Sequence, residues 1–553
     1  MNNYYPTNPN DQPVTAGKAL LLSLLVAIWV FTGLVGHDPW KQDEAISFGP
    51  VYSMLQSGDW LVPMLAGEPY LDKPPLFYVA AAAFARLFSP WLPLHDGARL
   101  VSGLLVSLTL LFVGLGAREL FGRGRGWPAV LILIGCLGML VRAHQMITDL
   151  GLLLGCAMML YAYGLIRRRP LLAGCLLGVG LGLGFMTKGF IAPIWFVLVS
   201  GGLLLFPNWR MRETYLALGV AVVVALPWLL VWPILLYQRS PTLFLEWLWV
   251  RNIGHWFAFA RGGDYSEALY YIKSLPWLAW PALPLAGWVV WQERTRVMRD
   301  AELQLPLLMF LVMLVTLSLI PDIQEVFALP MLLPLSLLAT ASLATLRRGA
   351  ANALDWFGIM TFGLLAILLW WGWAGLLLDN EAHITKLFKQ ALPEFVPAFR
   401  PWAFWSAVVF SILWVTLVWR VGRSFRRAVV NWASGVTLVW VLAMTLWLPW
   451  IDMGKSYRSM VYSLKEALPV EHGCIAGQNL GNAQRAMLDY FGGIVTVAPT
   501  QNACEWLLVQ GGSLAQQTDI SGRWKQTWEG GRPGDIDERY RLYRRMKGAP
   551  GIH

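Results

Sequence analysis

Charged residues gather just after the first apolar segment, in a pattern suited to chemistry on a charged group. The first of them are His37, Asp38, Lys41, Asp43 and Glu44, and residues 67–75 then read Gly-Glu-Pro-Tyr-Leu-Asp-Lys-Pro-Pro. The two prolines restrict the backbone after Lys73 and so place its ammonium group. Ionisable residues near membrane depth are costly and are functional candidates by default. The plainer alternative is solvated charge at a membrane interface.

Two further ionisable residues border apolar runs. Asp149 lies inside such a run, where an unpaired carboxylate is expensive, so we expect a cation or a water-filled cavity beside it. Lys188 stands between two short apolar runs and is a candidate phosphate contact. Two plain alternatives stay open at this point: Asp149 as an exposed helix cap, and Lys188 as an interfacial anchor.

A later loop carries Glu246, Arg251 and His255. Arg251 suits phosphate because its planar guanidinium donates two parallel hydrogen bonds. His255, nine residues after Glu246, is a candidate metal ligand, but two ligands do not define a metal site. No cofactor is firmly implied, and a divalent metal stays open. Walker A, G-x-S-x-G, H-E-x-x-H and C-x-x-C motifs do not occur, which argues against soluble nucleotide and hydrolase chemistries.

The elements that must position these residues are transmembrane helices. Of the 553 residues, 57% are hydrophobic and 14% are charged, whereas a soluble domain is nearer ~45–50% and ~25%. A spanning helix needs ~20 mostly apolar residues. We predict thirteen spans, at residues 17–35, 97–116, 127–141, 146–165, 171–186, 190–206, 215–236, 277–291, 305–320, 326–345, 357–377, 402–419 and 430–450. The composition excludes a soluble multidomain enzyme, a disordered chain and a disulfide scaffold.

Arginines cluster in alternate loops between these spans. They lie around residues 118–125, 167–169, 210–212, 294–299, 347–348 and 420–427. The positive-inside rule puts these loops and the N-terminus in the cytoplasm. Residues 36–96, 237–276, 378–401 and 451–553 then face outward. The net charge of +10 is therefore a signal of topology rather than of nucleic-acid binding.

We expect two domains, a transmembrane domain at 1–450 and an outer α/β domain at 451–553. Alternating patterns predict helices around residue 465 and at 482–491, and strands at 474–478, 494–497, 506–510 and 540–543. Cys474 and Cys504 lie in this second domain and could pair if it faces an oxidising compartment.

The first outer loop resembles that of membrane glycosyltransferases with the GT-C fold. The resemblance rests on Asp43-Glu44, on Ser57-Gly58-Asp59-Trp60 and on residues 67–78. The branch it resembles is the protein O-mannosyltransferase-like one, which includes the lipid A aminoarabinose transferases. Asp149, residues 187–189 and residues 327–330 match further short motifs, so the resemblance spans residues 40–335. The chain departs from the family at Ala45-Ile46-Ser47, where Arg-Tyr is common, and at residues 324–327, where Lys and Tyr are common.

The resemblance implies a polytopic α-helical GT-C enzyme of the bacterial inner membrane, acting as a monomer with its site and C-terminal domain in the periplasm. It implies inverting transfer of 4-amino-4-deoxy-L-arabinose from undecaprenyl phosphate to a lipid A phosphate, which confers resistance to polymyxin. The implied catalytic residues are Asp43, Glu44, Asp149 and Lys73. The implied donor-phosphate or substrate contacts are Tyr70, Lys73, Lys188, Arg251 and His255.

Two alternatives stay open. One is a related bacterial transferase that uses a protein hydroxyl or another envelope acceptor, as the O-mannosyltransferases do. The other is a transporter of a lipid-linked substrate. Transporters place ionisable residues near the bilayer midplane and often contain inverted repeats. Here the charged candidates gather at the outer face and no repeat is visible, which favours an enzyme.

Overall fold

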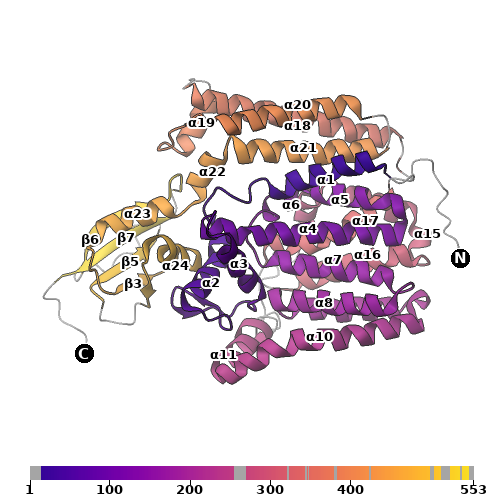
Figure 1. Ribbon diagram of the computed structural model, residues 1–553, viewed down its shortest axis with the longest axis horizontal. Coiled ribbons are helices and arrows are strands. Elements are labelled where there is room, and N and C mark those ends of the chain that lie inside the picture. Colours follow the sequence, from indigo (N-terminus) through magenta and orange to yellow (C-terminus); the bar gives the residue numbers. More distant parts are fainter. Residues whose placement is uncertain are drawn as a thin grey trace.

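The computed structural model describes residues 14–254, 269–320, 323–342, 346, 348–378, 383–421, 425–498, 504–511, 524–535 and 538–546. Long helices lie side by side in a bundle, and a smaller α/β domain lies at one end of it (Figure 1). The helices of the first half are α1 (Ala16–Phe31), α2 (Asp43–Ser57), α3 (Leu76–Phe88), α4 (Leu94–Phe121), α5 (Gly126–Ile134), α6 (Leu137–Arg142), α7 (Asp149–Leu165), α8 (Pro170–Lys188), α9 (Ile191–Leu204), α10 (Arg212–Arg239) and α11 (Pro241–Leu245). Those of the second half are α13 (Tyr270–Leu278), α14 (Ala282–Gln292), α15 (Arg294–Val297), α16 (Ala301–Ser318), α17 (Leu332–Ser342), α18 (Arg348–Leu377), α19 (His383–Ala391), α20 (Pro401–Arg420), α21 (Phe425–Thr445), α22 (Leu448–Lys455), α23 (Arg458–Ala467) and α24 (Asn482–Met487).

The predicted spans all fall on helices. Within the described residues, eight helical segments are long and apolar enough to cross a membrane: α4, α8, α10, α16, residues 325–342, α18, α20 and α21. The other five predicted spans fall on the shorter helices α1, α5 with α6, α7, α9 and α14. The span predicted at 127–141 is divided, because the helix stops at Ile134 and a new one starts at Leu137. The protein is therefore a multi-pass helical membrane protein.

The two ends of the bundle differ in character. The α/β domain, α2 and α3 gather at one end, and the start of α1 and α15 lie at the other (Figure 1). The predicted arginine-rich loops follow α4, α7 and α14 and precede α10, and these helix ends all lie opposite the α/β domain. These loops therefore lie on one side of the bundle, as the arginine pattern predicted.

Small residues bring α8 very close to its neighbours. A Cβ atom on Gly155 would lie 2.5 Å from the carbonyl oxygen of Gly180, so α7 and α8 meet backbone to backbone. On the other side of α8, a Cβ on Gly174 would lie 2.6 Å from the carbonyl oxygen of Ala217 in α10. Membrane helices associate through such close packing of small residues. This packing sets the first residue of α7 beside the last residue of α8.

The C-terminal domain contains a five-stranded mixed sheet in the order β4-β3-β5-β7-β6. Its strands are β3 (Ile475–Gln478), β4 (Thr496–Val497), β5 (Trp506–Gln510), β6 (Trp524–Gly531) and β7 (Arg539–Arg545). Strands β4, β3 and β5 are parallel, and β7 and β6 continue antiparallel. The sequence pattern missed β6, because this edge strand is largely exposed and lacks an apolar alternation.

Helix α24 docks the C-terminal domain onto α2. A Cβ on Gly49 would lie 2.9 Å from the Cβ of Ala486, so the glycine allows the close approach. Phe48 packs edge-on against Tyr490, with ring centroids 4.7 Å apart. Arg485 also pairs at 2.8 Å with Glu68, which lies in the short hairpin strand β2 (Glu68–Pro69). The C-terminal domain therefore rests directly on the loop that carries the predicted site.

A disulfide joins Cys474 to Cys504 in the C-terminal domain. We expect both thiols to resist maleimide labelling in non-reduced protein and to react after reduction, giving two added labels in a gel-shift assay. Protein unfolded in detergent, with and without a reductant, supplies the control for label access. Labelling of Cys474 and Cys504 without a reductant would contradict the pairing.

Candidate functional site

A cavity of about 460 Å³ opens at the end of the bundle that faces the C-terminal domain. Six of the eight residues predicted from the sequence line it: Asp43, Tyr70, Lys73, Asp149, Lys188 and Arg251. They come from the start of α2, the loop before α3, the start of α7, the end of α8 and the helical turn at residues 246–253. The fold thus joins segments that are up to about 200 residues apart in the sequence.

Asp149 and Lys188 form a buried ion pair in the cavity wall. The Lys188 ammonium donates to the Asp149 carboxylate at 2.5 Å, and the two side chains are only 9% and 5% exposed. Lys188 also lies 4.2 Å from the ring centroid of Phe327, a favourable cation–π distance. The expected cation beside Asp149 is therefore present. The alternatives of an exposed cap and an interfacial anchor are wrong, because both side chains are buried against each other.

Asp43 and Lys73 are the more available charges of the cavity. The Asp43 carboxylate accepts a hydrogen bond from Arg142 at 2.6 Å, yet its side chain remains 40% exposed. Lys73 is half-buried. Among the described residues that line the cavity, it is the one cation without a hydrogen bond or ion pair of its own. An anionic ligand group can approach its ammonium without displacing a protein carboxylate.

Arg251 and Tyr70 form another part of the wall. The Arg251 guanidinium donates to Asp72 at 2.9 Å and to Glu246 at 3.3 Å, and its side chain is 44% exposed. A guanidinium has five N–H donors, so these two contacts leave others for a ligand. Burial and the neighbouring Asp72 raise the pKa of Tyr70, so its phenol is neutral. Tyr70 therefore adds no charge to the cavity, and its hydroxyl is hydrogen-bonded to Asp72.

Glu44 does not face the cavity. Its carboxylate is completely buried, accepts from Arg99 at 2.5 Å and also accepts the backbone N–H groups of Trp40 and Met146. Burial opposes its ionisation, but the attraction of Arg99 holds the pKa of Glu44 below its usual range. The structure thus gives Glu44 a different place from the catalytic one expected. His255 lies outside the described residues, so its predicted role stays a prediction.

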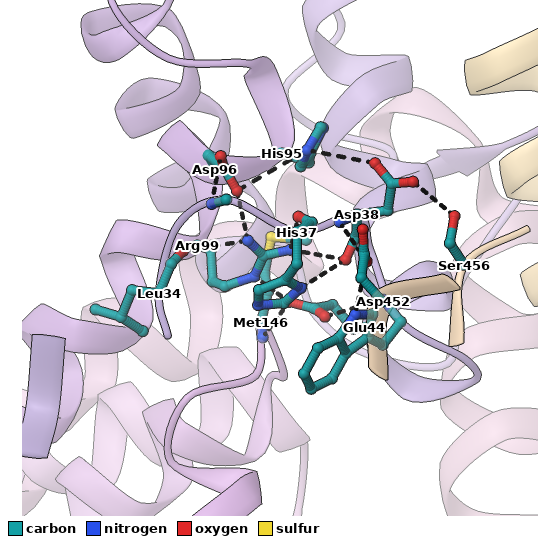
Figure 2. Close-up of polar contacts among 12 residues, drawn as sticks. Leu34, His37, Asp38, Glu44, His95, Asp96, Arg99, Met146, Asp452 and Ser456 are labelled. Carbon is teal, nitrogen blue, oxygen red and sulfur yellow. Dashed lines mark hydrogen bonds and ion pairs between the residues drawn. The ribbon is translucent and has the colours of Figure 1, made fainter. Parts of the chain in front are cut away.

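Arg99 is the centre of a buried polar network that the sequence did not reveal (Figure 2). Besides Glu44, it binds the Asp96 carboxylate at 2.7 Å and the carbonyl oxygens of Leu34, His37 and Asp38 at 3.1–3.2 Å. These contacts fix the backbone before Asp43. Through the Glu44 bond to the Met146 N–H, they also fix the segment that leads to Asp149.

Asp38 extends this network to the C-terminal domain. Ser456 donates to its carboxylate at 2.6 Å, and Arg458 holds it with two hydrogen bonds. Burial alone would raise the pKa of Asp38, but the hydrogen bonds from Arg458 and Ser456 outweigh burial and lower it. The start of α23 is therefore held to the first outer loop by a charged pair.

Among the described residues, no cation forms an ion pair with Asp452. It accepts the Asp38 N–H and the Trp40 indole N–H, both at 3.0 Å. Burial and the nearby Asp38 carboxylate raise the pKa of Asp452 to about 6. The folded protein therefore holds the proton of Asp452 more tightly than the unfolded chain does. Its ionisation lowers the stability of the folded protein as the pH rises towards about 6, and the loss is complete above that pH.

We expect Asp452→Asn to raise the melting temperature at pH 7.5 by about 1–3 °C, and this gain to vanish as the pH falls to 4. The amide keeps the acceptor and removes the charge. His37 acts in the opposite direction, since burial and Arg99 lower its pKa to about 4. The test is therefore the difference between variant and wild type at each pH, with Asp59→Asn as the control. A difference that grows towards acid pH would refute the assignment.

The cavity also contains residues that the sequence did not single out. Asn482 of the C-terminal domain lines it, although it lies more than 200 residues after Arg251, the last of the predicted residues in the cavity. Ile46, Ser47, Gln324 and Val326 line it as well. These four lie within the two stretches where the chain departs from the family pattern. The departures therefore fall on the walls of the cavity.

Comparison with known proteins identifies the family. Residues 72–232 match the family described as dolichyl-phosphate-mannose-protein mannosyltransferase. An undecaprenyl phosphate-α-4-amino-4-deoxy-L-arabinose arabinosyl transferase of Pseudomonas savastanoi pv. phaseolicola is 30% identical over 375 residues, covering 64% of this chain and 67% of the relative. The chain belongs to this family of glycosyltransferases. A second such transferase, from Pseudomonas fluorescens Pf0-1, is 29% identical over 433 residues, covering 72% and 76%.

The fold of this glycosyltransferase is the predicted GT-C fold. The crystal structure of ArnT from Cupriavidus metallidurans bound to undecaprenyl phosphate aligns with a TM-score of 0.68, at 16% identity, over 98% of this chain and 100% of that one. The predicted fold class and family are confirmed. The enzyme is a polyprenyl-phosphate-sugar-dependent glycosyltransferase of the membrane.

Proposed function

We propose that this glycosyltransferase transfers 4-amino-4-deoxy-L-arabinose from undecaprenyl phosphate to a phosphate of lipid A, with inversion, at the periplasmic face of the bacterial inner membrane. The names of its relatives support the donor and the sugar. The observation that carries the proposal is Lys73, an uncommitted cation in a cavity that also contains Asp43 and the Asp149–Lys188 pair. Such a cavity offers a cation to a departing phosphate and carboxylates to a cationic sugar.

Charge and the fold support this orientation. The arginine-rich loops lie at the end of the bundle opposite the cavity, and the positive-inside rule assigns that end to the cytoplasm. The Cys474–Cys504 disulfide supports an oxidising compartment for the C-terminal domain. A sugar carried on a lipid is the donor that an outward-facing site requires, because nucleotide sugars are made in the cytoplasm.

In the proposed step, an oxygen of the acceptor phosphate attacks the anomeric carbon while the bond to the donor phosphate breaks. The bonding electrons leave with undecaprenyl phosphate, whose new negative charge Lys73 and Arg251 neutralise. These charge-assisted contacts strengthen as the leaving group departs, so they favour the transition state over the ground state. Asp43 stabilises the positive charge that develops on the sugar, by analogy with glycoside chemistry. An ionised phosphate acceptor needs no general base.

A second candidate is a related transferase that glycosylates another envelope acceptor, such as a protein hydroxyl. Ile46, Ser47, Gln324 and Val326 favour it, because these departures from the family pattern lie in the cavity wall. A hydroxyl must lose a proton as it attacks, and Asp43 would then act as the general base. The two candidates therefore differ in what Asp43 must do.

The deciding experiment is mass spectrometry of lipid A from deletion cells that make the donor and carry wild-type enzyme, Asp43→Ala or Asp59→Ala. Asp59 lies in the same loop but outside the cavity lining. We expect aminoarabinose on lipid A with wild type and Asp59→Ala only, together with polymyxin resistance from the added positive charge. Unchanged lipid A with wild type would reject this acceptor and direct the search to envelope glycoproteins and glycans.

We expect Lys73→Gln to lower kcat/KM for the lipid-linked donor by about 10²–10³-fold, because the leaving phosphate loses its uncommitted cation. Lys73→Arg should restore part of the rate. Lys41→Gln is the matched control, since Lys41 lies in the same loop and pairs with Asp535. An equal loss of kcat/KM in Lys73→Gln and Lys41→Gln would contradict a specific contact of Lys73 with the phosphate, because the total charge of the loop would then explain the effect.

A further inference from the structure

A second cavity lies in the side of the bundle, away from the transferase site. It has a volume of about 630 Å³ and is lined by α1, α4, α5 and the turn between α4 and α5. Its walls are mostly apolar and include Val26, Val30, Leu110 and Val130. Along α4 the lining residues run from Ser107 to Arg118, so this wall of the groove is about 16 Å long at 1.5 Å per residue.

Two arginines lie at one end of this groove. Arg118, in the last turn of α4, and Arg123, in the turn after it, both line the groove and are exposed. Neither has an ion pair or a hydrogen bond within the described part of the chain. Gly126 leaves room for the Arg118 stem, because a Cβ there would lie 2.8 Å from the Arg118 Cγ. Trp127 lines the same end and is suited to the membrane–water interface.

The arginine end of the groove lies opposite the C-terminal domain, where α1 begins and α4 ends (Figure 1). The hydrocarbon core of one leaflet is about 15 Å deep, so the groove is long enough for an acyl chain that starts at this surface. An acyl chain fills the apolar walls, and two uncompensated guanidinium groups attract a phosphate. Basic pockets between membrane helices bind anionic lipid head groups in this way.

We propose that this groove binds one anionic glycerophospholipid of the leaflet opposite the transferase site. One acyl chain lies between α1, α4 and α5, and the head-group phosphate lies between Arg118 and Arg123. The proposal rests on the groove and its two arginines and is independent of the donor, the acceptor and the role of Asp43.

The test is native mass spectrometry of the purified full-length protein, titrated with palmitoyl-oleoyl-phosphatidylglycerol or with the zwitterionic phosphatidylcholine of the same chains. We expect the Kd of the first bound phosphatidylglycerol to be roughly ten- to thirtyfold lower than that of phosphatidylcholine. Each arginine is expected to contribute about fivefold to this difference in Kd. Arg118→Gln with Arg123→Gln should remove this preference, and lysine at both positions should restore most of it. Ser23→Trp, which places a ring in the groove, should weaken both lipids.

The matched control is Arg169→Gln with Arg212→Gln. These two arginines are exposed at the same end of the bundle but do not line the groove. The control variant should keep the wild-type preference. Equal binding of the two lipids by wild type, or an equal loss in the control variant, would overturn the proposal. Tighter binding of undecaprenyl phosphate than of phosphatidylglycerol at Arg118 and Arg123 would also overturn it, because the occupant would then be the carrier lipid.

Discussion

Asp43→Asn is expected to lower the rate of sugar transfer by roughly 10³-fold while the melting temperature changes by less than about 2 °C. The Asp43 side chain is 40% exposed in the cavity and has one strong partner, Arg142. Its removal therefore costs little packing. An amide of the same shape can still accept from Arg142, but it cannot stabilise the positive charge that develops on the sugar. The measurement is single-turnover transfer from a synthetic polyprenyl-phosphate donor, with thermal unfolding of the same samples.

Asp59→Asn serves as the control for this experiment. Asp59 accepts the backbone N–H of Leu61 at 3.0 Å and lies in the same outer loop, but it does not line the cavity. The control should transfer sugar at close to the wild-type rate. If Asp43→Asn retained full turnover, the first loop would only shape the fold, and the proposed role of Asp43 would be wrong.

The Glu44–Arg99 pair should have the opposite signature, a large loss of stability. We expect Glu44→Gln or Arg99→Gln to destabilise the folded protein by about 3–5 kcal/mol, since the first leaves the buried Arg99 with Asp96 as its one carboxylate and the second leaves the Glu44 carboxylate buried without a cation. Both side chains are fully buried. Arg99 also holds three backbone carbonyls, so its loss should release the loop that leads to Asp43. Thermal unfolding in detergent and the yield of monodisperse protein measure this effect.

Glu119→Gln is the matched control on the same helix. Glu119 lies near the opposite end of α4 and pairs with Arg168, whose side chain is 69% exposed. A solvated pair of this kind contributes about 0–1 kcal/mol, so this variant should unfold close to wild type. The double variant Glu44→Gln, Arg99→Gln should lose less stability than the two single losses combined, because the pair is coupled. Additive losses would show that the two residues act separately.

These two predictions assign different roles to Asp43 and Glu44, which are adjacent in the sequence but have different surroundings. Successive residues of an α-helix point about 100° apart, so Asp43 and Glu44 at the start of α2 face different partners. One reaches the cavity and the other the buried Arg99. Since Arg458 and Ser456 hold Asp38 in the same network, the C-terminal domain supports the site through its contacts with the first loop.

The sequence by itself determined the membrane class, the positions of the helices and the alternation of the arginine-rich loops between them. These features follow from local composition, because apolar length and flanking arginines act span by span. It also placed Asp43, Lys73, Asp149, Lys188 and Arg251 among the candidates, since charge beside apolar runs is costly wherever the chain folds.

Only the tertiary structure decided which of these charges are paired. Lys188 binds Asp149 because glycine packing aligns the ends of α7 and α8, and Arg251 meets Asp72 across 179 residues. Arg99 looked like an ordinary residue at the start of a span, yet it organises the buried network. Asn482 reaches the cavity only because α24 docks on α2. Such contacts depend on helix rotation and on domain docking, which are set by packing between distant segments and leave no local pattern in the sequence.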